Sequence, residues 1–293
     1  MRSVLVRSGA TVAAGAAALM TLLAASPVTT RLDGYQITMK MTVEMPATEM
    51  PVGMPPGPMN MDMVIKTADG RLRMEIDFAK FMGTNAGYMA AAGAMLNGTY
   101  ILLQPDGKML TVMPSMRVAM SADAGSLLSG GMGAGDVSEK VDTAPGWLKV
   151  TDLGAGERVA GYATRRFRAD MKFKTTVDEN GLKTTETNDS SYEFWITTDR
   201  GDVMAALRAF DKATGNSVVG GQKEISDALM SKLPPNSSVL RAVGHNLTNE
   251  GKTSMKMEVT EIKKATFEPA EFEVPPGVQV MDMNAMTGGR GRN

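Results

Sequence analysis

The residues with the clearest chemical potential are methionines, whose thioether sulfur is a soft metal ligand. The chain of 293 residues contains 27 Met, one His and no Cys. Six methionines fall in a stretch rich in proline, and they are Met45, Met50, Met54, Met59, Met61 and Met63. Soft thioethers select Cu(I) over hard cations. One hypothesis is therefore a Cu(I) or Ag(I) site in the segment 45–63, with Met54, Met59, Met61 and Met63 as its ligands.

A second interpretation of the methionines is structural. Methionine is flexible and fills irregular apolar space, so it suits a core or a pocket that accepts varied shapes. Six methionines outside the proline-rich stretch alternate with polar residues and neighbour Ile, Val or Phe, which favours a structural role for Met39, Met41, Met74, Met171, Met255 and Met257. The segment 45–63 fits either interpretation.

Nucleophiles and bases do not form a recognisable catalytic pattern. The nearest approach to a nucleophile elbow, Gly-Asn-Ser-Val-Val at 215–219, ends in Val where the motif needs Gly. The single histidine, His245, lies in an alternating, strand-like run. Without Cys the chain has no thiol nucleophile and no disulfide. We therefore expect a protein that is not an enzyme, with no catalytic residues and no cofactor.

Charge gives no sign of a nucleic-acid partner. The chain has 31 Lys and Arg against 32 Asp and Glu, a net charge of −1. A balanced chain creates no field that attracts polyanions. The densest basic group, at 165–174, mostly alternates with Phe167, Ala169, Met171 and Phe173, as on the outward face of an amphipathic strand.

The first 30 residues have the pattern of a secretory signal. Arg2 and Arg7 precede an apolar stretch at 11–25, and small residues follow it. That stretch is shorter than the roughly 20 apolar residues a membrane span needs. We expect cleavage between residues 25 and 30, a periplasmic or extracellular protein, and no integral membrane anchor after cleavage. The last residues, 284–293, are predicted to be a disordered tail.

The remaining chain is patterned for antiparallel strands. From Tyr35 apolar residues alternate with polar ones, and a second alternating run includes Leu72, Met74 and Ile76. Turn sequences separate such runs at Asp69-Gly70, Asp106-Gly107, Asn180-Gly181 and 249–251. Successive hairpins predict a meandering antiparallel sheet. Helical spacing appears at 203–213 and 222–233, and a third helix is expected at 79–96. The fold class is therefore α+β and mainly antiparallel β.

Three short segments carry a resemblance to a known group. They are GERVAGYATRRF at 156–167, YEFWITTD at 192–199 and FEVPPGV at 272–278. They resemble segments of exported proteins of unknown function whose fold looks like the lipoprotein carriers LolA and LolB. Thr164 stands where relatives often have Cys. The resemblance implies one domain over 31–283, an open, curved half-barrel sheet with two or three helices covering its concave face. In the carriers that cavity holds lipoprotein acyl chains.

The alternation and the resemblance predict the same function. We expect a non-enzymatic exported protein that binds an apolar ligand, such as a lipid, an acyl chain or a lipidated envelope protein, between sheet and helices. The residues expected to line that cavity are Tyr35, Ile37, Met39, Met41, Val43, Leu72, Met74, Ile76, Phe167, Met171, Phe173, Met255 and Met257. Two alternatives remain open. One is Cu(I) or Ag(I) binding by segment 45–63, and the other is an envelope protein-interaction module with a filled core.

Overall fold

The computed structural model describes most of the chain between residues 31 and 282. The described residues are 31–46, 57–77, 96–105, 108–121, 137–179, 182–199, 201, 203–205, 207, 223–249 and 251–282. The predicted signal at 1–30, the predicted tail, Met50, Met54 and nearly all of the predicted helix at 79–96 lie outside them.

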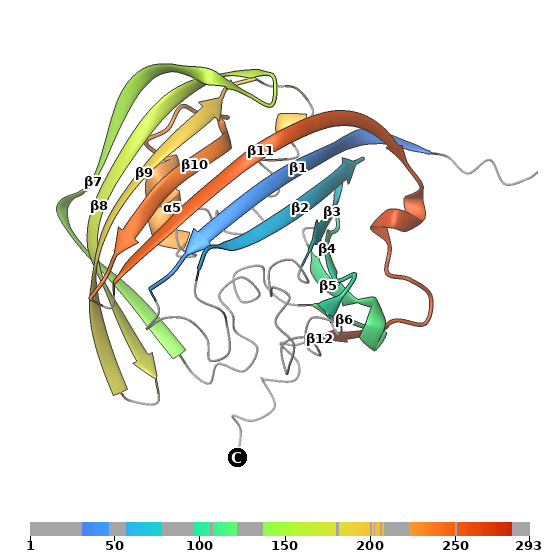
Figure 1. The fold of residues 1–293 in the computed structure, drawn as a ribbon. Helices are drawn as coiled ribbons and strands as arrows, with labels where there is room; N and C mark the ends of the chain where they lie inside the picture. Colours follow the sequence, from blue (N-terminus) through green and yellow to red (C-terminus); the bar gives the residue numbers. More distant parts are fainter. Residues whose placement is uncertain are drawn as a thin grey trace, which may run out of the picture.

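Twelve strands form a single open sheet (Figure 1). They are β1 Leu32–Glu44, β2 Met59–Ala68, β3 Arg71–Ile76, β4 Tyr100–Leu103, β5 Met109–Met113, β6 Val118–Ser121, β7 Val137–Val159, β8 Tyr162–Glu179, β9 Leu182–Thr197, β10 Ser238–Leu247, β11 Lys252–Phe267 and β12 Gln279–Asp282. Their order is β12-β6-β5-β4-β3-β2-β1-β11-β10-β9-β8-β7. The described helices are α5 Lys223–Met230 and the short 3-10 turns η1 Pro114–Met116 and η3 Pro269–Phe272.

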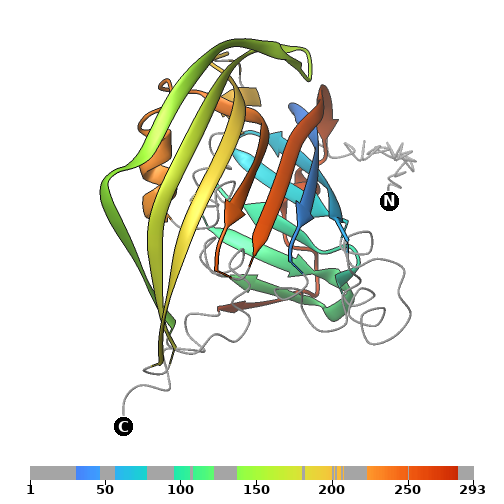
Figure 2. The same ribbon diagram turned by 60° about the vertical axis from the view of Figure 1, so that its left-hand side comes forward.

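Two antiparallel meanders make up the sheet, as the turn sequences predict. β1 to β6 follow one another on one side, β7 to β11 on the other, and β1 pairs with β11 where the two meet. The β2–β3 hairpin turns at Asp69 and Gly70, both with positive φ of 50° and 71°, as an Asp-Gly hairpin turn requires. Figures 1 and 2 show that the sheet bends strongly between its two edges.

Three strands of this sheet, β6, β7 and β12, were not anticipated. β6 has only four residues and follows β5 across η1, without an Asp-Gly or Asn-Gly turn to signal it. β7 is broken by register shifts against β8 between Thr143 and Leu148 and between Asp152 and Gly154. These irregularities interrupt the period-two pattern that identifies a strand. β12 has only four residues and pairs parallel with β6, so no hairpin turn signals it.

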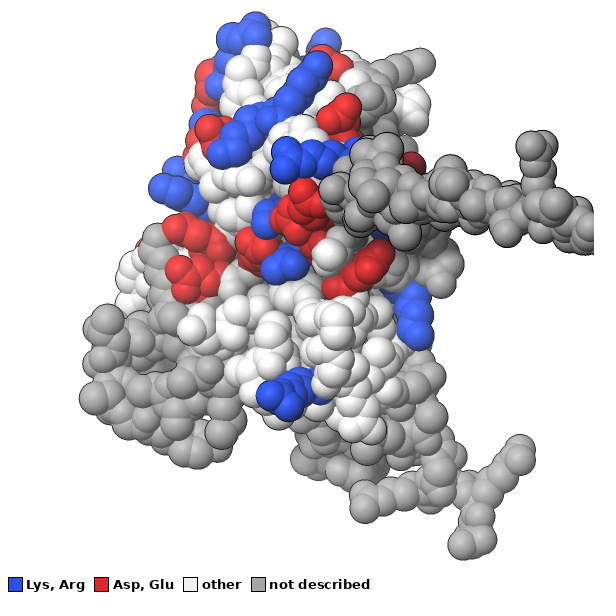
Figure 3. Space-filling model, turned by 90° about the vertical axis from the view of Figure 1, so that its right-hand side faces the viewer, with Lys and Arg blue, Asp and Glu red and all other residues white. Residues whose placement is uncertain are grey.

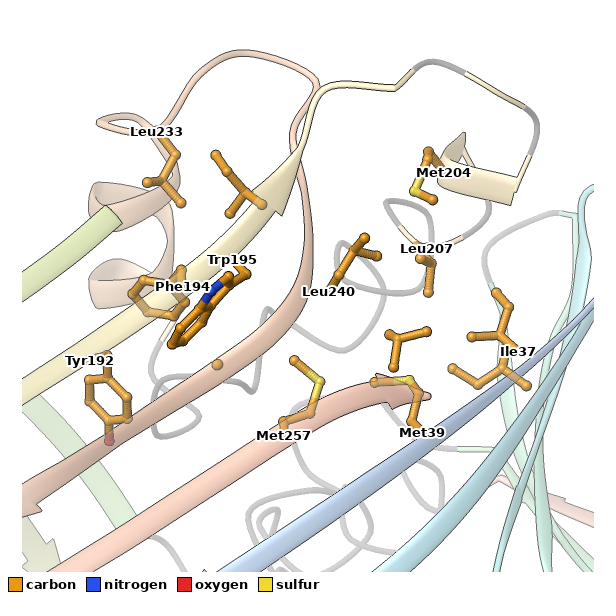
Figure 4. Packing of buried hydrophobic residues seen from close by; sticks show 14 of the residues in the cluster. Ile37, Met39, Tyr192, Phe194, Trp195, Met204, Leu207, Leu233, Leu240 and Met257 are labelled. Atoms are coloured by element: carbon orange, nitrogen blue, oxygen red, sulfur yellow. The ribbon is translucent and has the colours of Figure 1, made fainter. Parts of the chain in front are cut away.

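The inner face of the sheet carries the main core. Alternation places Ile37 and Met39 of β1 in one buried cluster with Ile225 and Leu229 of α5. Residues 203–205 and 207 are helical, so helical structure is present within both predicted segments at 203–213 and 222–233. Met204 and Leu207 lie over Ile37, Met39 and Leu240 (Figure 4). Helical residues therefore pack against the apolar face of the strands.

The C-terminal segment covers the opposite face of β4 to β6. Val274 and Val278 pack against a buried group that includes Tyr100 and Leu102. Phe272 is buried in a T-shaped contact with Phe267, with ring centroids 5.5 Å apart. The Gln104 Nε2 amide donates to the Phe272 carbonyl at 3.1 Å. The third recognised segment, 272–278, is thus part of the core of the fold.

Gly34 of β1 lies at a point where β1 and the end of β2 come very close together. A Cβ at Gly34 would lie 1.9 Å from the Thr67 carbonyl oxygen, a backbone atom that cannot move aside cheaply. Gly34→Ala should lower the free energy of unfolding by about 3 kcal/mol. Gly277→Ala is the control: it has positive φ but nothing within 4 Å, so it should cost about 1–2 kcal/mol. Urea unfolding measures both, and equal losses would contradict the close approach.

Candidate functional site

The predicted lining residues gather on the inner face of the sheet. Eight of them belong to the buried cluster, namely Ile37, Met39, Leu72, Met74, Phe167, Met171, Phe173 and Met257. Four more pack against it while half-buried, namely Tyr35, Met41, Ile76 and Met255. Val43 is half-buried and lies outside the cluster. The alternation therefore brings together all but one of these side chains.

Aromatic residues of β9 belong to this face, although they were absent from the predicted lining. The rings of Tyr192 and Phe194 stack with centroids 6.1 Å apart, and burial raises the pKa of the Tyr192 phenol. Gly244 of β10 leaves room for the Tyr192 ring, because a Cβ there would lie 2.3 Å from a ring carbon. The alternation of Tyr192, Phe194 and Ile196 in the second recognised segment was the signal that could have placed them here.

A pocket of about 730 Å³ opens at one end of the inner face. Leu72 and Leu103, both buried members of the main cluster, line it together with the exposed Ala205. Charged residues from three separate parts of the chain line it as well, namely Asp33, Asp69, Arg71 and Lys264. The pocket therefore combines an apolar lining that continues into the core with a polar rim carrying both signs of charge.

A second pocket, of about 640 Å³, lies between β8, β9 and the segment that follows α5. Arg165 and Lys232 line it. Asp152 pairs with Arg165 at 2.7 Å, and this hydrogen bond lowers the pKa of the Asp152 carboxyl. The positive charge of Arg165 is thus already matched by a carboxylate.

Three of the four methionines proposed as metal ligands lie in a strand, and the fourth, Met54, lies outside the described residues. Met59, Met61 and Met63 are on one face of β2, where Met61 is opposite Met41 and Met63 is opposite Met39. Within the described residues, no group of three or more His, Asp or Glu side chains could hold a metal ion.

The first two recognised segments meet on the outer face around Trp195. The Trp195 indole N–H donates to the Glu157 carboxylate at 2.7 Å, and the guanidinium groups of Arg166 and Arg241 each lie 5.2 Å from its ring centroid. The Thr164 hydroxyl donates to the Glu157 carbonyl at 2.5 Å. These contacts tie β7, β8, β9 and β10 together, so the segments act as structural elements of the fold.

Basic side chains on the outer face are neutralised by neighbouring acids. Arg166 pairs with Glu193 at 2.6 Å and Lys172 with Asp189 at 3.2 Å, as predicted for an outward amphipathic face. On the side that carries η3, blue and red side chains are interspersed (Figure 3), and Lys66 pairs there with Glu271 at 3.0 Å. Neither area presents the basic stripe on which a nucleic acid would bind.

Comparison with known proteins gives a distant structural likeness. No family model and no curated protein matches the chain. Among solved structures, it is similar to a "putative outer membrane lipoprotein-sorting protein domain from Vibrio parahaemolyticus". The likeness covers 83% of this chain and 89% of that one, at 8% identity and a TM-score of 0.30. Its description names the class of proteins that the three segments resemble. Within the described residues, no helix is long and apolar enough to cross a membrane.

The Glu157 contacts predict acid sensitivity. The hydrogen bond from the Trp195 indole, and then the Arg241 guanidinium, lower the pKa of Glu157 below its ordinary value. In the unfolded chain a Glu carboxyl titrates at about 4.3. The stabilisation is therefore complete above that pH and is lost as the pH falls through the lower folded-state pKa. Glu157→Gln should be less stable at pH 7 and should lose less stability than the unmodified chain between pH 5 and pH 3. Thermal unfolding against pH measures this, and parallel curves would contradict it.

Proposed function

We propose that the chain is a non-enzymatic exported protein that binds an amphiphile, with the acyl chain of a lipid or lipidated partner held against the inner face of an open half-barrel. The observation that carries the proposal is the pocket of about 730 Å³, whose apolar lining at Leu72 and Leu103 continues into the buried cluster. Its volume falls within the range of about 300–1,000 Å³ that is typical of ligand sites.

Burial of the acyl chain supplies the driving force for such binding. Each buried methylene contributes about 0.8 kcal/mol. An acyl chain with about ten methylenes in the pocket therefore gains about 8 kcal/mol, which corresponds to a micromolar complex before the costs of association. The pocket has a mixed rim, with Asp33 and Asp69 beside Arg71 and Lys264. This rim suits a polar or zwitterionic headgroup and favours an amphiphile over a plain hydrocarbon.

Flexible methionine side chains in the core can make room for an acyl chain. Beneath the helical residues the core is filled, because Ile37, Leu240 and Val259 have no exposed surface. Met39, Met74, Met204 and Met257 are buried in the same cluster. Flexible thioether side chains change rotamer more easily than branched ones. In this proposal they move aside as the ligand enters past Ala205.

Sequence supports the proposed location and partner class. The pattern at 1–30 predicts export, and the three recognised segments resemble proteins whose fold looks like that of lipoprotein carriers. A lipidated envelope protein or a free lipid supplies the acyl chain, and no catalytic step is required.

Two exposed alanines provide a matched test of the entry route. Ala205 lines the larger pocket and Ala163 the smaller one, and both are exposed. Ala205→Trp should fill the entrance and weaken binding of a fluorescent fatty acid at least tenfold, while Ala163→Trp should leave it unchanged. Both variants should stay within about 0.5 kcal/mol of the unmodified stability. Equal affinity in all three proteins would rule out entry at this pocket, and no binding by any of them would favour a filled core.

A further inference from the structure

Seven methionines from three adjacent strands share one region of the inner face. On each strand they are spaced by two residues, which places them on one side of it. The seven, hereafter the methionine lattice, are Met39 and Met41 of β1, Met59, Met61 and Met63 of β2, and Met255 and Met257 of β11.

The register brings three of these side chains into one row. Met41 of the middle strand is directly opposite Met61 on β2 and Met257 on β11. In antiparallel pairs, directly opposed Cβ atoms lie about 4.5–5.5 Å apart. Because the methionine side chain is long and unbranched, the two outer residues can extend toward the middle one. Three thioethers can therefore converge above Met41.

The row lies where the buried core gives way to partly exposed surface. Met257 is 2% exposed, whereas Met41, Met61 and Met255 are half-buried. Further along the same strands, the opposed pair Ile37 and Ile65 is completely buried. The row therefore lies at the edge of the buried core, where Met41 and Met61 keep exposed surface that a small ion can reach.

The donor set selects one class of metal ion. The lattice offers only neutral sulfur, and its neighbours on the same face are apolar residues such as Val43 and Val259. Soft thioethers favour Cu(I) and related soft ions. A single positive charge also costs less to desolvate here than a double one. Thioethers carry no proton to lose, so binding would not release protons as it does at Cys or His ligands.

We propose that Met41, Met61 and Met257 form a binding site for a soft monovalent cation, Cu(I) or Ag(I), with the other lattice methionines as alternative ligands. The site is distinct from the pocket at Leu72 and Leu103 and does not depend on lipid binding.

Silver provides a direct test because Ag(I) needs no reductant. The unmodified protein, with its methionine methyl groups labelled with ¹³C, is titrated with Ag(I) and followed by methyl NMR. The triple variant Met41→Leu, Met61→Leu, Met257→Leu keeps the face apolar and should bind Ag(I) at least tenfold more weakly. A matched control, Met74→Leu, Met109→Leu, Met171→Leu, replaces three buried methionines of the same cluster that lie outside the lattice and should bind as tightly as the unmodified chain.

The outcomes separate the alternatives. Shifts confined to the lattice methyl groups at one equivalent, with an affinity that is the same at pH 5.5 and pH 7.5, support the site. Equal weakening in both triple variants, or shifts spread over all methionines, would overturn it. Loss of binding in Met54→Leu alone would place the site in the proline-rich segment and also overturn it. Fatty-acid binding is measured in parallel on the unmodified protein, and fatty-acid binding without Ag(I) binding shows that only the metal proposal has failed.

Discussion

The pairing of β1 with both β2 and β11 is the constraint on which the rest of the structure depends. This pairing joins the two meanders into one sheet, because β1 lies between β2 of its own meander and β11 of the other. A slip of one residue would turn Ile37, Met39 and Met41 away from the core. The register shifts only between Thr38 and Met39, where the Thr260 hydroxyl donates to the Thr38 carbonyl at 3.2 Å. The extra residue is Thr260 of β11, and it allows Met257 and Val259 on one side of it and Ile262 on the other to pack against the same inner cluster.

Local patterns in the sequence were sufficient to predict the hairpins and the faces of their strands. The chain turns at Asp69-Gly70 as expected. The strands on either side of Asn180-Gly181 are paired, with Glu179 of β8 opposite Leu182 of β9. The pairing of β1 with β11 could not be predicted, because it joins residues more than 200 positions apart and no turn sequence specifies it. β7 was missed for a different reason, since Pro145 and Gly146 interrupt its alternation. The long-range contacts therefore came from the structure alone.

Part of the candidate site could likewise be predicted from local sequence patterns, and part could not. Alternation placed all but one of the predicted lining residues in or against the inner cluster, because the face of a strand residue follows from its spacing. Other members of the cluster, such as Tyr192 and Phe194, were not predicted. The pocket was not predictable, since Asp33, Asp69, Ala205 and Lys264 come from four separate parts of the chain. The recognised segments around Gly156 and Trp195 suggested function, yet their contacts hold four strands together on the outer face. Short shared segments can thus mark the framework of a fold and not its binding site.

The most direct test of the central claim, that the inner face binds a lipid, is native mass spectrometry of the mature chain. The protein is examined after mild purification, and again after delipidation and incubation with fatty acids and phospholipids. Binding at a single pocket predicts one lipid per chain, lost on delipidation and restored by the added lipid. A chain that carries no lipid after purification and takes up none afterwards would contradict the claim.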